Sequence, residues 1–411
     1  MKYQVGIVGL GRVGLPLALS FINKGVTVIG FDINEELNTS VKNKVMPFHE
    51  PGYDEILKNN NLFSSSDFTH LKDVENVIIT VGTPLLAHIE TDLSQLKQVL
   101  SVIIKHLVKG QNIILRSTVA PKTSKFVHLF IENNTNFVIG KDIYLSFCPE
   151  RIAEGKARVE LEILPQIVGS EDNESAKRSA DLFSNLTPQI FHTDFVSAEL
   201  VKLFNNTYRY INFSISNQFA IIAEDYDVSI YDIIKMANTD YPRSNIPFPG
   251  LTAGSCLRKD FGMINETNSY SDLLLNAWKI NEFIPKFLVE KALEHRSFTN
   301  RNIGVLGYSF KKDTDDTRDS LVPKLVRYIE REVPKNIYVH EPNIPNQMLD
   351  DTYKNYEFKE VIENCEIIFI ALNHTAFYQN IDEILNYNKD RETIFIDYWN
   401  VSGKNQIIFR S

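Results

Sequence analysis

The residues best suited to covalent chemistry lie in the stretch GSCLRKD at positions 254–260, in a chain of 411 residues. Cys256 follows small residues there and precedes Lys259 and Asp260. A thiolate is a strong nucleophile, so this stretch is compatible with a reactive cysteine. The plainer interpretation is a small apolar side chain that packs in a turn.

A second set of residues has the spacing of a dinucleotide-binding loop. Gly9, Gly11 and Gly14 form G-x-G-x-x-G between a short apolar strand at residues 5–8 and an apolar helical segment. Glycines at this spacing allow a tight turn, the approach of a pyrophosphate and close packing of helix on strand. Asp32 ends the next expected strand, where an acid suits a ribose 2′-OH and repels a 2′-phosphate. The pattern favours NAD over NADP, and the alternative is a glycine turn in a nucleotide-free domain.

Alternating strands and helices must position these residues. Strands are expected in VENVIITVGTP, NIILRSTVAPKTS and IYLSFCPERIAEG, with QIVGS as the last strand of this domain. A helix is expected in DLSQLKQVLSVIIKHLV, with Asp92 or Ser94 as its cap. Thr83, Thr118 and Glu150 stand near the ends of the three strands, at the edge where parallel sheets bind ligands.

A long helix is expected at the middle of the chain, because the residues from 197 to 227 include no glycine or proline. Ser197 is a candidate N-cap, and the helix would be about 40 Å long. Lys202 and Asn206 lie four residues apart and therefore share one face. Apolar residues on both sides indicate burial on more than one face, as in a spine between domains or a dimer interface.

The second half repeats the α/β pattern after further helices and a loop rich in proline and glycine. Strands are expected in RNIGVLGYSF, NIYVHEP, CEIIFIALN and TIFIDYWN, without a G-x-G-x-x-G fingerprint. The predicted fold class is α/β, with two Rossmann-like doubly wound domains joined by a long central helix. The expected domains are an NAD-binding domain at 1–190, a helical dimerisation domain at 191–298 and a second Rossmann-like domain at 299–411.

Composition excludes several classes of function. The net charge of -9 argues against nucleic-acid binding, and no apolar run approaches the ~18 residues of a membrane span. The N-terminus passes directly into a strand pattern, so no signal peptide is expected. Cys148, Cys256 and Cys365 are too widely spaced for a disulfide framework or a zinc motif, and the histidines show no metal-ligand spacing. A cytoplasmic location is the default, with Cys148 and Cys365 as core residues.

Taken together, several segments resemble the UDP-glucose/GDP-mannose dehydrogenase family over the length of the chain. They are GIVGLGRVGLPLA, VGTP, RSTVAPKTS, CPERIAEGKA, AELVKLFNNTYRYINFSISNQ, GSCLRKD and GYSFKKDTDDTRDS. Members of that family oxidise the C6 alcohol of a nucleotide sugar to a carboxylate with two NAD+. The resemblance implies two Rossmann-like domains and a homodimer formed by the long helix.

The resemblance also implies catalytic roles. Cys256 would trap an aldehyde as a thiohemiacetal, and a second hydride transfer would leave a thioester that water hydrolyses. Lys202, with Lys259, would lower the pKa of the thiol and, with Asn206, stabilise the oxyanion. Glu150 would be the general base of the hydrolysis, and Thr118 and Asp260 would hold the water that takes the C6 proton.

Binding residues carry over in the same way. Arg243 resembles an arginine that reaches the nucleotide sugar across the dimer, and Lys311 and Arg318 resemble contacts from the second Rossmann-like domain. The implied cofactor residues are Gly9, Gly11, Arg12, Val13, Gly14, Asp32, Thr83, Thr118 and Lys259. The implied substrate residues are Glu150, Arg151, Lys202, Asn206, Arg243, Gly254, Lys311 and Arg318.

Plainer interpretations exist for three of these residues. Lys202 is otherwise a solvated lysine, Arg243 an ordinary loop arginine, and Arg318 a partner only for Asp315 or Asp316. The chain also departs from the family pattern: Thr252-Ala253 stands where glycines are common, Arg258 where proline is common, and Lys122 where glycine is frequent. These departures put the loop geometry in doubt more than the chemistry.

The substrate signals conflict. GSC..KD and FKKDTDDTR look like the UDP-glucose enzymes, whereas CPER, NTYR and NHTAF look like the UDP-N-acetylhexosamine enzymes. We favour oxidation of a UDP-N-acetylhexosamine to a UDP-uronic acid, a donor for a surface polysaccharide, with UDP-glucose as the alternative. A two-electron hydroxyacid dehydrogenase would need neither Cys256 nor a second Rossmann-like domain. A catalytically silent NAD- or UDP-sugar-binding protein would bind ligands without producing NADH.

Overall fold

The computed structural model describes residues 2–86, 90–252, 254, 257–267, 270, 272–345, 348–387 and 392–410, and only the backbone of Arg258, Thr267 and Tyr387. The chain forms two compact units. The first unit comprises residues 1–205 and 262–269, and the second comprises residues 206–261 and 270–411. Among the described residues, no helix is long and apolar enough to cross a membrane.

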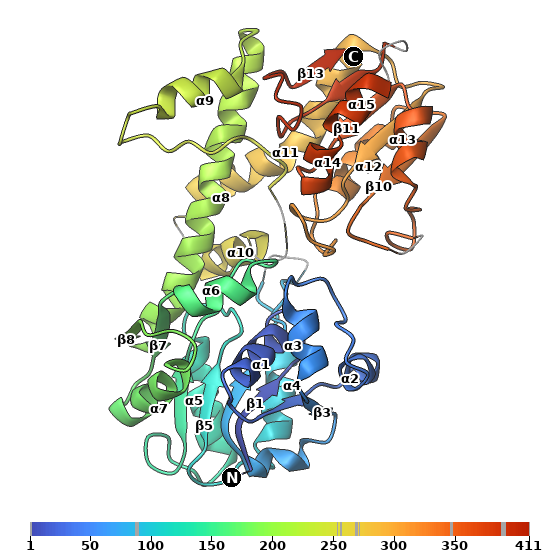
Figure 1. Ribbon diagram of the computed structural model, residues 1–411. Coiled ribbons are helices and arrows are strands. Elements are labelled where there is room, and N and C mark those ends of the chain that lie inside the picture. The colour runs from blue at the N-terminus through green and yellow to red at the C-terminus, as the bar shows by residue number, and fades with distance from the viewer. Residues whose placement is uncertain are drawn as a thin grey trace. The chain divides into compact units, whose positions relative to one another are not determined.

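The first unit is built on an eight-stranded sheet (Figure 1). Its strands are β1 Tyr3–Val8, β2 Val28–Phe31, β3 Phe63–Ser65, β4 Val74–Ile79, β5 Asn112–Leu115, β6 Tyr144–Phe147, β7 Gln166–Gly169 and β8 Ile190–Thr193. Their order is β3-β2-β1-β4-β5-β6-β7-β8, and only the β6–β7 pair is antiparallel. The first six strands have the order of a dinucleotide-binding domain. The prediction that QIVGS is the last strand is wrong, because β8 extends the sheet beyond it.

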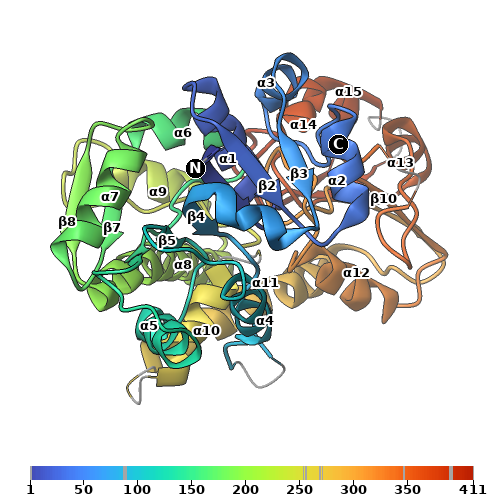
Figure 2. The ribbon, with the colours of Figure 1, turned by 90° about the horizontal axis from the view of Figure 1, so that it is seen from below.

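Helices cover both faces of this sheet (Figure 2). They are α1 Gly14–Asn23, α2 Glu35–Lys42, α3 Tyr53–Asn59, η1 Phe68–Asp73, α4 Ser94–Ile103, α5 Thr123–Asn134, α6 Ala157–Ile163 and α7 Asn173–Phe183. Alternate strand residues face opposite sides, because the side-chain period of a strand is two. Ile7 and Ile78 pack with α1, α3, α6 and α7, whereas Val8 and Ile79 pack with α4 and α5. Both faces are buried, which explains why the strands are continuous apolar runs.

The expected long helix is present as α8 Phe195–Asp225, 31 residues that begin in the first unit and end in the second. Its N-cap is not Ser197 as predicted. Asp194 precedes the helix and accepts hydrogen bonds from the backbone and hydroxyl of Ser197, at 2.9 and 2.6 Å. Aspartate and serine are similarly good N-cap residues, so the sequence pattern alone could not decide between Asp194 and Ser197.

The second unit contains a five-stranded sheet of order β10-β9-β11-β12-β13, antiparallel only at β12–β13. Its strands are β9 Asn302–Leu306, β10 Asn336–His340, β11 Ile367–Ile370, β12 Ile394–Ile396 and β13 Ile408–Arg410. Its helices, beside the end of α8, are α9 Ile230–Asn238, α10 Leu257–Thr267, α11 Asp272–His295, α12 Val322–Glu330, α13 Phe358–Asn364, α14 Thr375–Gln379 and α15 Ile381–Tyr387. α10 continues into the first unit at residue 262. Residues of α11 and α12 pack on one face, and residues of α13, α14 and α15 on the other. The predicted fold class is confirmed.

Candidate functional site

The glycine-rich loop of the first unit has the geometry that a pyrophosphate requires. Gly9 has φ +96°, in the region that favours glycine, and a Cβ on Gly14 would lie 1.9 Å from the carbonyl oxygen of Gly9. A Cβ on Gly11 would meet no atom within 4 Å, so this side of the loop is open. Val13 immediately precedes α1, whose first backbone N–H groups therefore follow the loop. The described residues fit a dinucleotide phosphate at this helix N-terminus.

Asp32 lies at the carboxyl end of β2, beside the same loop. Its carboxylate accepts hydrogen bonds from the backbone N–H of Leu10 at 2.7 Å and of Asn34 at 2.9 Å. These bonds fix an acid where a ribose would lie. Arg12 pairs with Glu154 at 2.5 Å, a carboxylate that the sequence analysis did not single out.

The loops after β4 and β5 are tied to each other. The Thr83 hydroxyl, which is buried, donates to the carbonyl oxygen of Thr118, and the Ser117 hydroxyl donates to that of Val81 at 2.7 Å. Two predicted cofactor residues, Thr83 and Thr118, are therefore neighbours. This proximity follows from their places after adjacent parallel strands.

Glu199 was not predicted as a site residue, yet it connects the Thr118 loop to α8. Its buried carboxylate accepts the backbone N–H of Lys122 and of Ser124, each at 2.7 Å, at the N-terminus of α5. Burial raises its pKa. Lys122 has φ +75°, a left-handed backbone conformation that glycine adopts more easily than lysine. The turn therefore has the shape expected of glycine, although a lysine occupies the position.

Glu150 is paired with a fully buried arginine that the sequence analysis also missed. Arg116, 2% exposed, places its Nε 3.0 Å and an Nη 2.5 Å from Oε2 of Glu150. Oε1 of Glu150 accepts the backbone N–H of Arg151 at 2.7 Å and of Ile152 at 2.9 Å. Both oxygens thus have hydrogen-bond donors, and the donors from Arg116 carry a positive charge. The half-buried side chain of Arg151 donates to the carbonyl oxygen of Pro165, and burial lowers its pKa.

One face of α8 carries three buried polar residues, Glu199, Lys202 and Asn206. Their spacing of three and four residues aligns them along the helix. Lys202 is only 7% exposed, and no hydrogen-bond acceptor for its ammonium is found within the described part of the chain. The Asn206 amide donates to Oδ2 of Asp260 at 2.6 Å, and Asp260 is fully buried on α10. The predicted Asn206 and Asp260 are therefore direct partners.

Cys256 lies outside the described residues, as do Ala253 and Ser255, whereas Gly254 and the chain from Leu257 are described. Gly254 has φ +104°, and its N–H donates to the carbonyl oxygen of Asp319 at 3.0 Å. A Cβ on Gly254 would lie 2.3 Å from the ring of Phe310, so glycine is required here. Lys259 is half-buried on α10, one residue before Asp260. Gly254 thus lies directly against the segment from 307 to 320.

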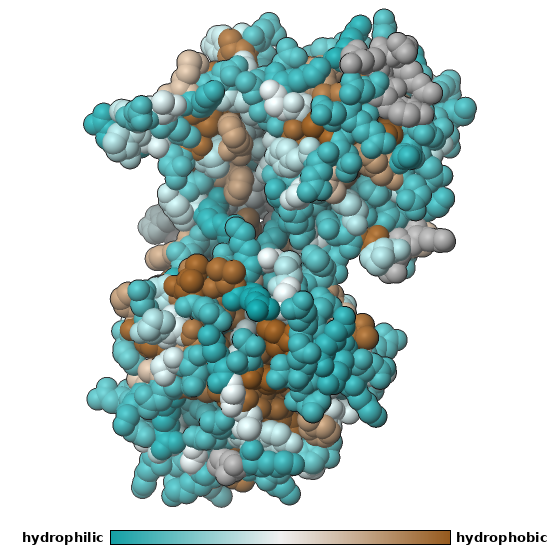
Figure 3. Space-filling view, viewed as in Figure 1, coloured by the Kyte–Doolittle hydropathy of each residue, from teal (hydrophilic) through white to brown (hydrophobic). Residues whose placement is uncertain are grey.

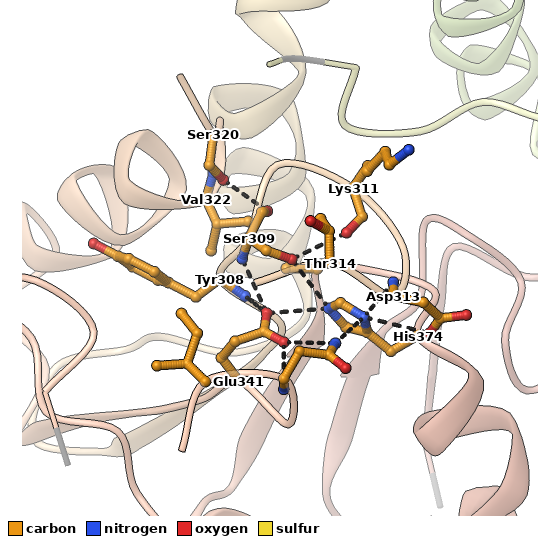
Figure 4. Close-up of polar contacts among 12 residues, drawn as sticks. Tyr308, Ser309, Lys311, Asp313, Thr314, Ser320, Val322, Glu341 and His374 are labelled. Carbon is orange, nitrogen blue, oxygen red and sulfur yellow. Dashed lines mark hydrogen bonds and ion pairs between the residues drawn. The ribbon is translucent and has the colours of Figure 1, made fainter. Parts of the chain in front are cut away.

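That segment follows β9 and carries Lys311, which Figure 4 shows, and Arg318. The Lys311 ammonium lies 5.8 Å from the ring centre of Phe310. Arg318 pairs with the buried Asp316 at 2.6 Å, as the plainer interpretation expected, while 64% of the Arg318 side chain stays exposed. An arginine oriented in this way still presents N–H groups to solvent.

Arg243, also in the second unit, lies on the loop after α9, where it stacks on Tyr241 with 4.8 Å between the guanidinium carbon and the ring centre. No described contact joins it to Lys311 or Arg318.

Cys148 and Cys365 are core residues as predicted, and burial raises the pKa of the Cys148 thiol to about 12. Burial also raises the pKa of Cys365.

Comparison with known proteins assigns the chain to a family. Residues 3–187, 196–283 and 304–404 match the NAD binding domain, the central domain and the UDP binding domain of the UDP-glucose/GDP-mannose dehydrogenase family. The UDP-N-acetyl-D-mannosamine dehydrogenase of Pyrococcus horikoshii is 32% identical over 386 residues, 91% of this chain and 90% of the relative.

Solved structures agree with this assignment. A UDP-D-ManNAc dehydrogenase structure from P. horikoshii superposes with a TM-score of 0.88, at 32% identity, over 97% of this chain and 96% of that one. The UDP-N-acetyl-mannosamine dehydrogenase of Staphylococcus aureus gives a TM-score of 0.82 at 28% identity, over 97% of this chain and 95% of that one. The chain belongs to the UDP-glucose/GDP-mannose dehydrogenase family and is an NAD-dependent dehydrogenase.

Proposed function

We propose that the chain oxidises the C6 alcohol of a UDP-N-acetylhexosamine, UDP-N-acetyl-D-mannosamine in the first place, to the uronic acid. The observation that carries this proposal is Lys202, which is only 7% exposed, lies one turn from the Asn206–Asp260 pair and has no acceptor for its ammonium among the described residues. An ammonium in such a place is stabilised when a ligand supplies the negative charge. The choice of sugar rests on the named activities of the relatives.

NAD would be held by the loop from Gly9 to Gly14 and by Asp32. Bound there, it accepts hydride from the substrate. The loop supplies helix N–H groups to the phosphates, and the fixed carboxylate of Asp32 suits the ribose hydroxyls. Thr83 and Thr118 shape the adjoining loops, and Lys259 is the remaining proposed cofactor contact.

The chemistry that we propose on the chain has four steps. The alcohol first loses a hydride, which NAD+ would accept, and a proton to a water held by Thr118 and Asp260, which gives an aldehyde. The Cys256 thiolate then adds to the aldehyde carbon as a thiohemiacetal, whose oxyanion Lys202 and Asn206 stabilise. The thiohemiacetal loses a second hydride, for which a second NAD+ would be the acceptor, and becomes a thioester. Water hydrolyses the thioester to the carboxylate and the free thiol, with Glu150 as the base.

Arg116 refines the proposed role of Glu150. Oε2 of Glu150 is bound by Arg116 and Oε1 accepts two backbone N–H groups, so the carboxylate is held in one orientation. In this orientation Glu150 can position the attacking water and take its proton as the thioester is hydrolysed. Lys311, Arg318 and, from a second subunit, Arg243 are the proposed contacts to the nucleotide sugar, with Gly254 shaping the loop beside them.

A substrate panel tests this proposal. The purified chain is given excess NAD+ with UDP-N-acetyl-D-mannosamine, UDP-N-acetylglucosamine, UDP-N-acetylgalactosamine or UDP-glucose, and NADH is followed by absorbance. We expect the highest kcat/KM with UDP-N-acetyl-D-mannosamine, and loss of turnover in Lys202→Met but not in the control Lys235→Met, which changes an exposed lysine on α9. Highest activity with UDP-glucose would move the assignment to the alternative sugar. Binding of a sugar without NADH would leave the silent binding protein.

We further propose a homodimer that forms along α8. Tyr208, Ile215, Phe219, Ile222 and Tyr226 are 41–76% exposed and follow one another at helical spacing. Figure 3 shows apolar residues along this helix and over α6. A long apolar stripe of this kind is typical of a helix that packs against another. Sedimentation should give twice the mass of the chain, a single mass for Phe219→Asp, and no change for the control Asn205→Asp.

The three-part division at 190 and 298 and a cytoplasmic location complete the proposal. The family matches to the NAD binding, central and UDP binding domains support the division. The free, buried Cys148 and Cys365 support a reducing compartment.

A further inference from the structure

A buried Glu341–His374 pair lies beneath the segment that carries Lys311 and Arg318 (Figure 4). We call residues 307–320 the phosphate-side loop, because it carries the two cations proposed to bind the nucleotide. Glu341 directly follows β10, and His374 directly precedes α14, so two separate elements meet the loop from below. Glu341 is 1% exposed and His374 is fully buried. Neither residue belongs to the predicted site.

Glu341 anchors the start of the phosphate-side loop. One oxygen, Oε2, accepts the backbone N–H of Tyr308 at 2.8 Å and of Ser309 at 2.9 Å, and contacts Nε2 of His374 at 3.1 Å. The other oxygen accepts two N–H groups of Asn343. Burial opposes ionisation, but the hydrogen bonds from His374 and from the two loop N–H groups lower the pKa of Glu341 to about 2. The carboxylate is therefore ionised at neutral pH and fully hydrogen-bonded.

His374 anchors the middle of the loop. Its Nδ1 accepts the backbone N–H of Asp313 at 2.9 Å and lies 3.0 Å from the Asn343 amide. These donors assign the proton of the neutral ring to Nε2, which faces Glu341. The Asp313 carboxylate in turn accepts hydrogen bonds from the backbone N–H and the hydroxyl of Thr375, the residue that follows His374, at 2.7 and 2.6 Å. Asp313 also has φ +54°, so the chain reverses there, two residues after Lys311.

The loop is closed by internal hydrogen bonds and lies against Gly254. The Ser320 hydroxyl donates to the carbonyl oxygen of Ser309 at 3.0 Å, and the N–H of Phe310 donates to that of Asp316 at 2.8 Å. Asp316 pairs with Arg318, and the ring of Phe310 lies against Gly254. A shift of the loop would therefore move Lys311, Arg318 and the ring that contacts Gly254.

We propose that Glu341 and His374 are positioning residues for nucleotide-sugar binding: they hold the phosphate-side loop in the shape that presents Lys311 and Arg318 to the diphosphate. The inference rests on the proposed role of those two cations. The pair acts through three backbone N–H groups of the loop, two accepted by Oε2 of Glu341 and one by Nδ1 of His374. A pair with a purely packing role would be replaceable by side chains of similar volume.

The test is the binding of UDP to the full-length chain, measured by calorimetry, with His374→Asn as the variant. Asparagine can keep an acceptor near the position of Nδ1 but loses the donor to Glu341. The matched control is His340→Asn, because His340 lies next to Glu341 and bonds the carbonyl oxygen of Tyr356 instead of the loop. We expect UDP to bind about tenfold more weakly to His374→Asn, the effect of losing a buried hydrogen bond to a charged group, and unchanged to the control.

A kinetic measurement separates positioning from general destabilisation. In His374→Asn, the KM for the sugar nucleotide should rise about tenfold, whereas kcat and the KM for NAD+ should stay within about twofold of the wild type. Asp313→Gly provides a second variant that should fold, since glycine accepts φ +54° and the Asp313 side chain is 43% exposed. It removes the hydrogen bonds of the carboxylate to Thr375 and its longer contacts to Lys312 and His374, but keeps the backbone N–H that His374 accepts, and should weaken UDP binding about threefold.

Wild-type UDP affinity in both folded variants would overturn the inference. Lys311→Ala and Arg318→Ala test the foundation separately. If these two changes leave UDP binding intact, the proposed nucleotide contacts are wrong and the inference is wrong with them. If they weaken binding while His374→Asn and Asp313→Gly do not, the nucleotide contacts stand and only the positioning role is refuted.

Discussion

Replacing Arg116 by methionine should destabilise the first unit strongly, because the buried carboxylate of Glu150 would lose its ion-pair partner. The Arg116 guanidinium donates to Glu150, to the carbonyl oxygen of Cys148 at 3.0 Å and to Gln166 at 2.9 Å, and it lies over the ring of Phe183. Removing one member of a buried ion pair costs about 3–5 kcal/mol. For a unit of this size, that corresponds to a fall on the order of 10 °C in its thermal midpoint.

The double variant Arg116→Met with Glu150→Gln makes this prediction specific. Once the carboxylate is gone, no charge is left unpaired, so the double variant should be more stable than Arg116→Met alone. Thermal or urea unfolding of the wild type, both single variants and the double variant gives the coupling energy. If the double variant is as unstable as the sum of the two single changes, Glu150 is not an ion held by Arg116 and the reasoning fails.

Three further changes have defined outcomes. Lys122→Gly should raise the free energy of unfolding by about 1 kcal/mol, because φ +75° strains a lysine but not a glycine; an unchanged urea midpoint would contradict this. Gly254→Ala should lower kcat/KM at least about tenfold without changing NAD+ affinity, because its Cβ would lie 2.3 Å from the Phe310 ring; full activity would contradict the close packing. The pKa of Glu341 is lowered from 4.5 to about 2, so the stability it contributes is present above pH 4.5 and is lost as the pH falls towards 2. The stability of the wild type relative to Glu341→Gln, followed by urea unfolding, should therefore fall by up to ~3 kcal/mol over that range, and a pH-independent difference would refute the assignment.

The sequence predicted the elements because their signals are local. Apolar strands, the G-x-G-x-x-G spacing and the run without glycine or proline are each visible in a short window, and they led to β1, α1 and α8. It also placed Asn206 and Asp260 in the site, through a family resemblance that names both positions. Their direct hydrogen bond joins residues 54 positions apart and needed the structure.

The partners of the site residues were missed for a related reason. Arg116 stands in the middle of a strand-to-loop pattern, where its charge looks like a surface residue until burial pairs it with Glu150. Glu199 is an acid near the start of α8, where an acid is expected to stabilise its own helix. Its carboxylate instead accepts backbone N–H groups at the N-terminus of a different helix, α5. The cap of α8 was misplaced because Asp194 and Ser197 are both good capping residues. The partners of Arg116 and Glu199, by contrast, lie far away in the sequence, and no short window contains those contacts.

The central claim is that one active site performs two oxidations through a thioester on Cys256. The most direct measurement supplies excess NAD+ with a limiting amount of UDP-N-acetyl-D-mannosamine, follows the reaction to completion and counts NADH per sugar, beside Cys256→Ser. The account predicts two NADH per sugar for the wild type and a reaction that stalls in the variant. One NADH per sugar, with Cys256→Ser as active as the wild type, would contradict it.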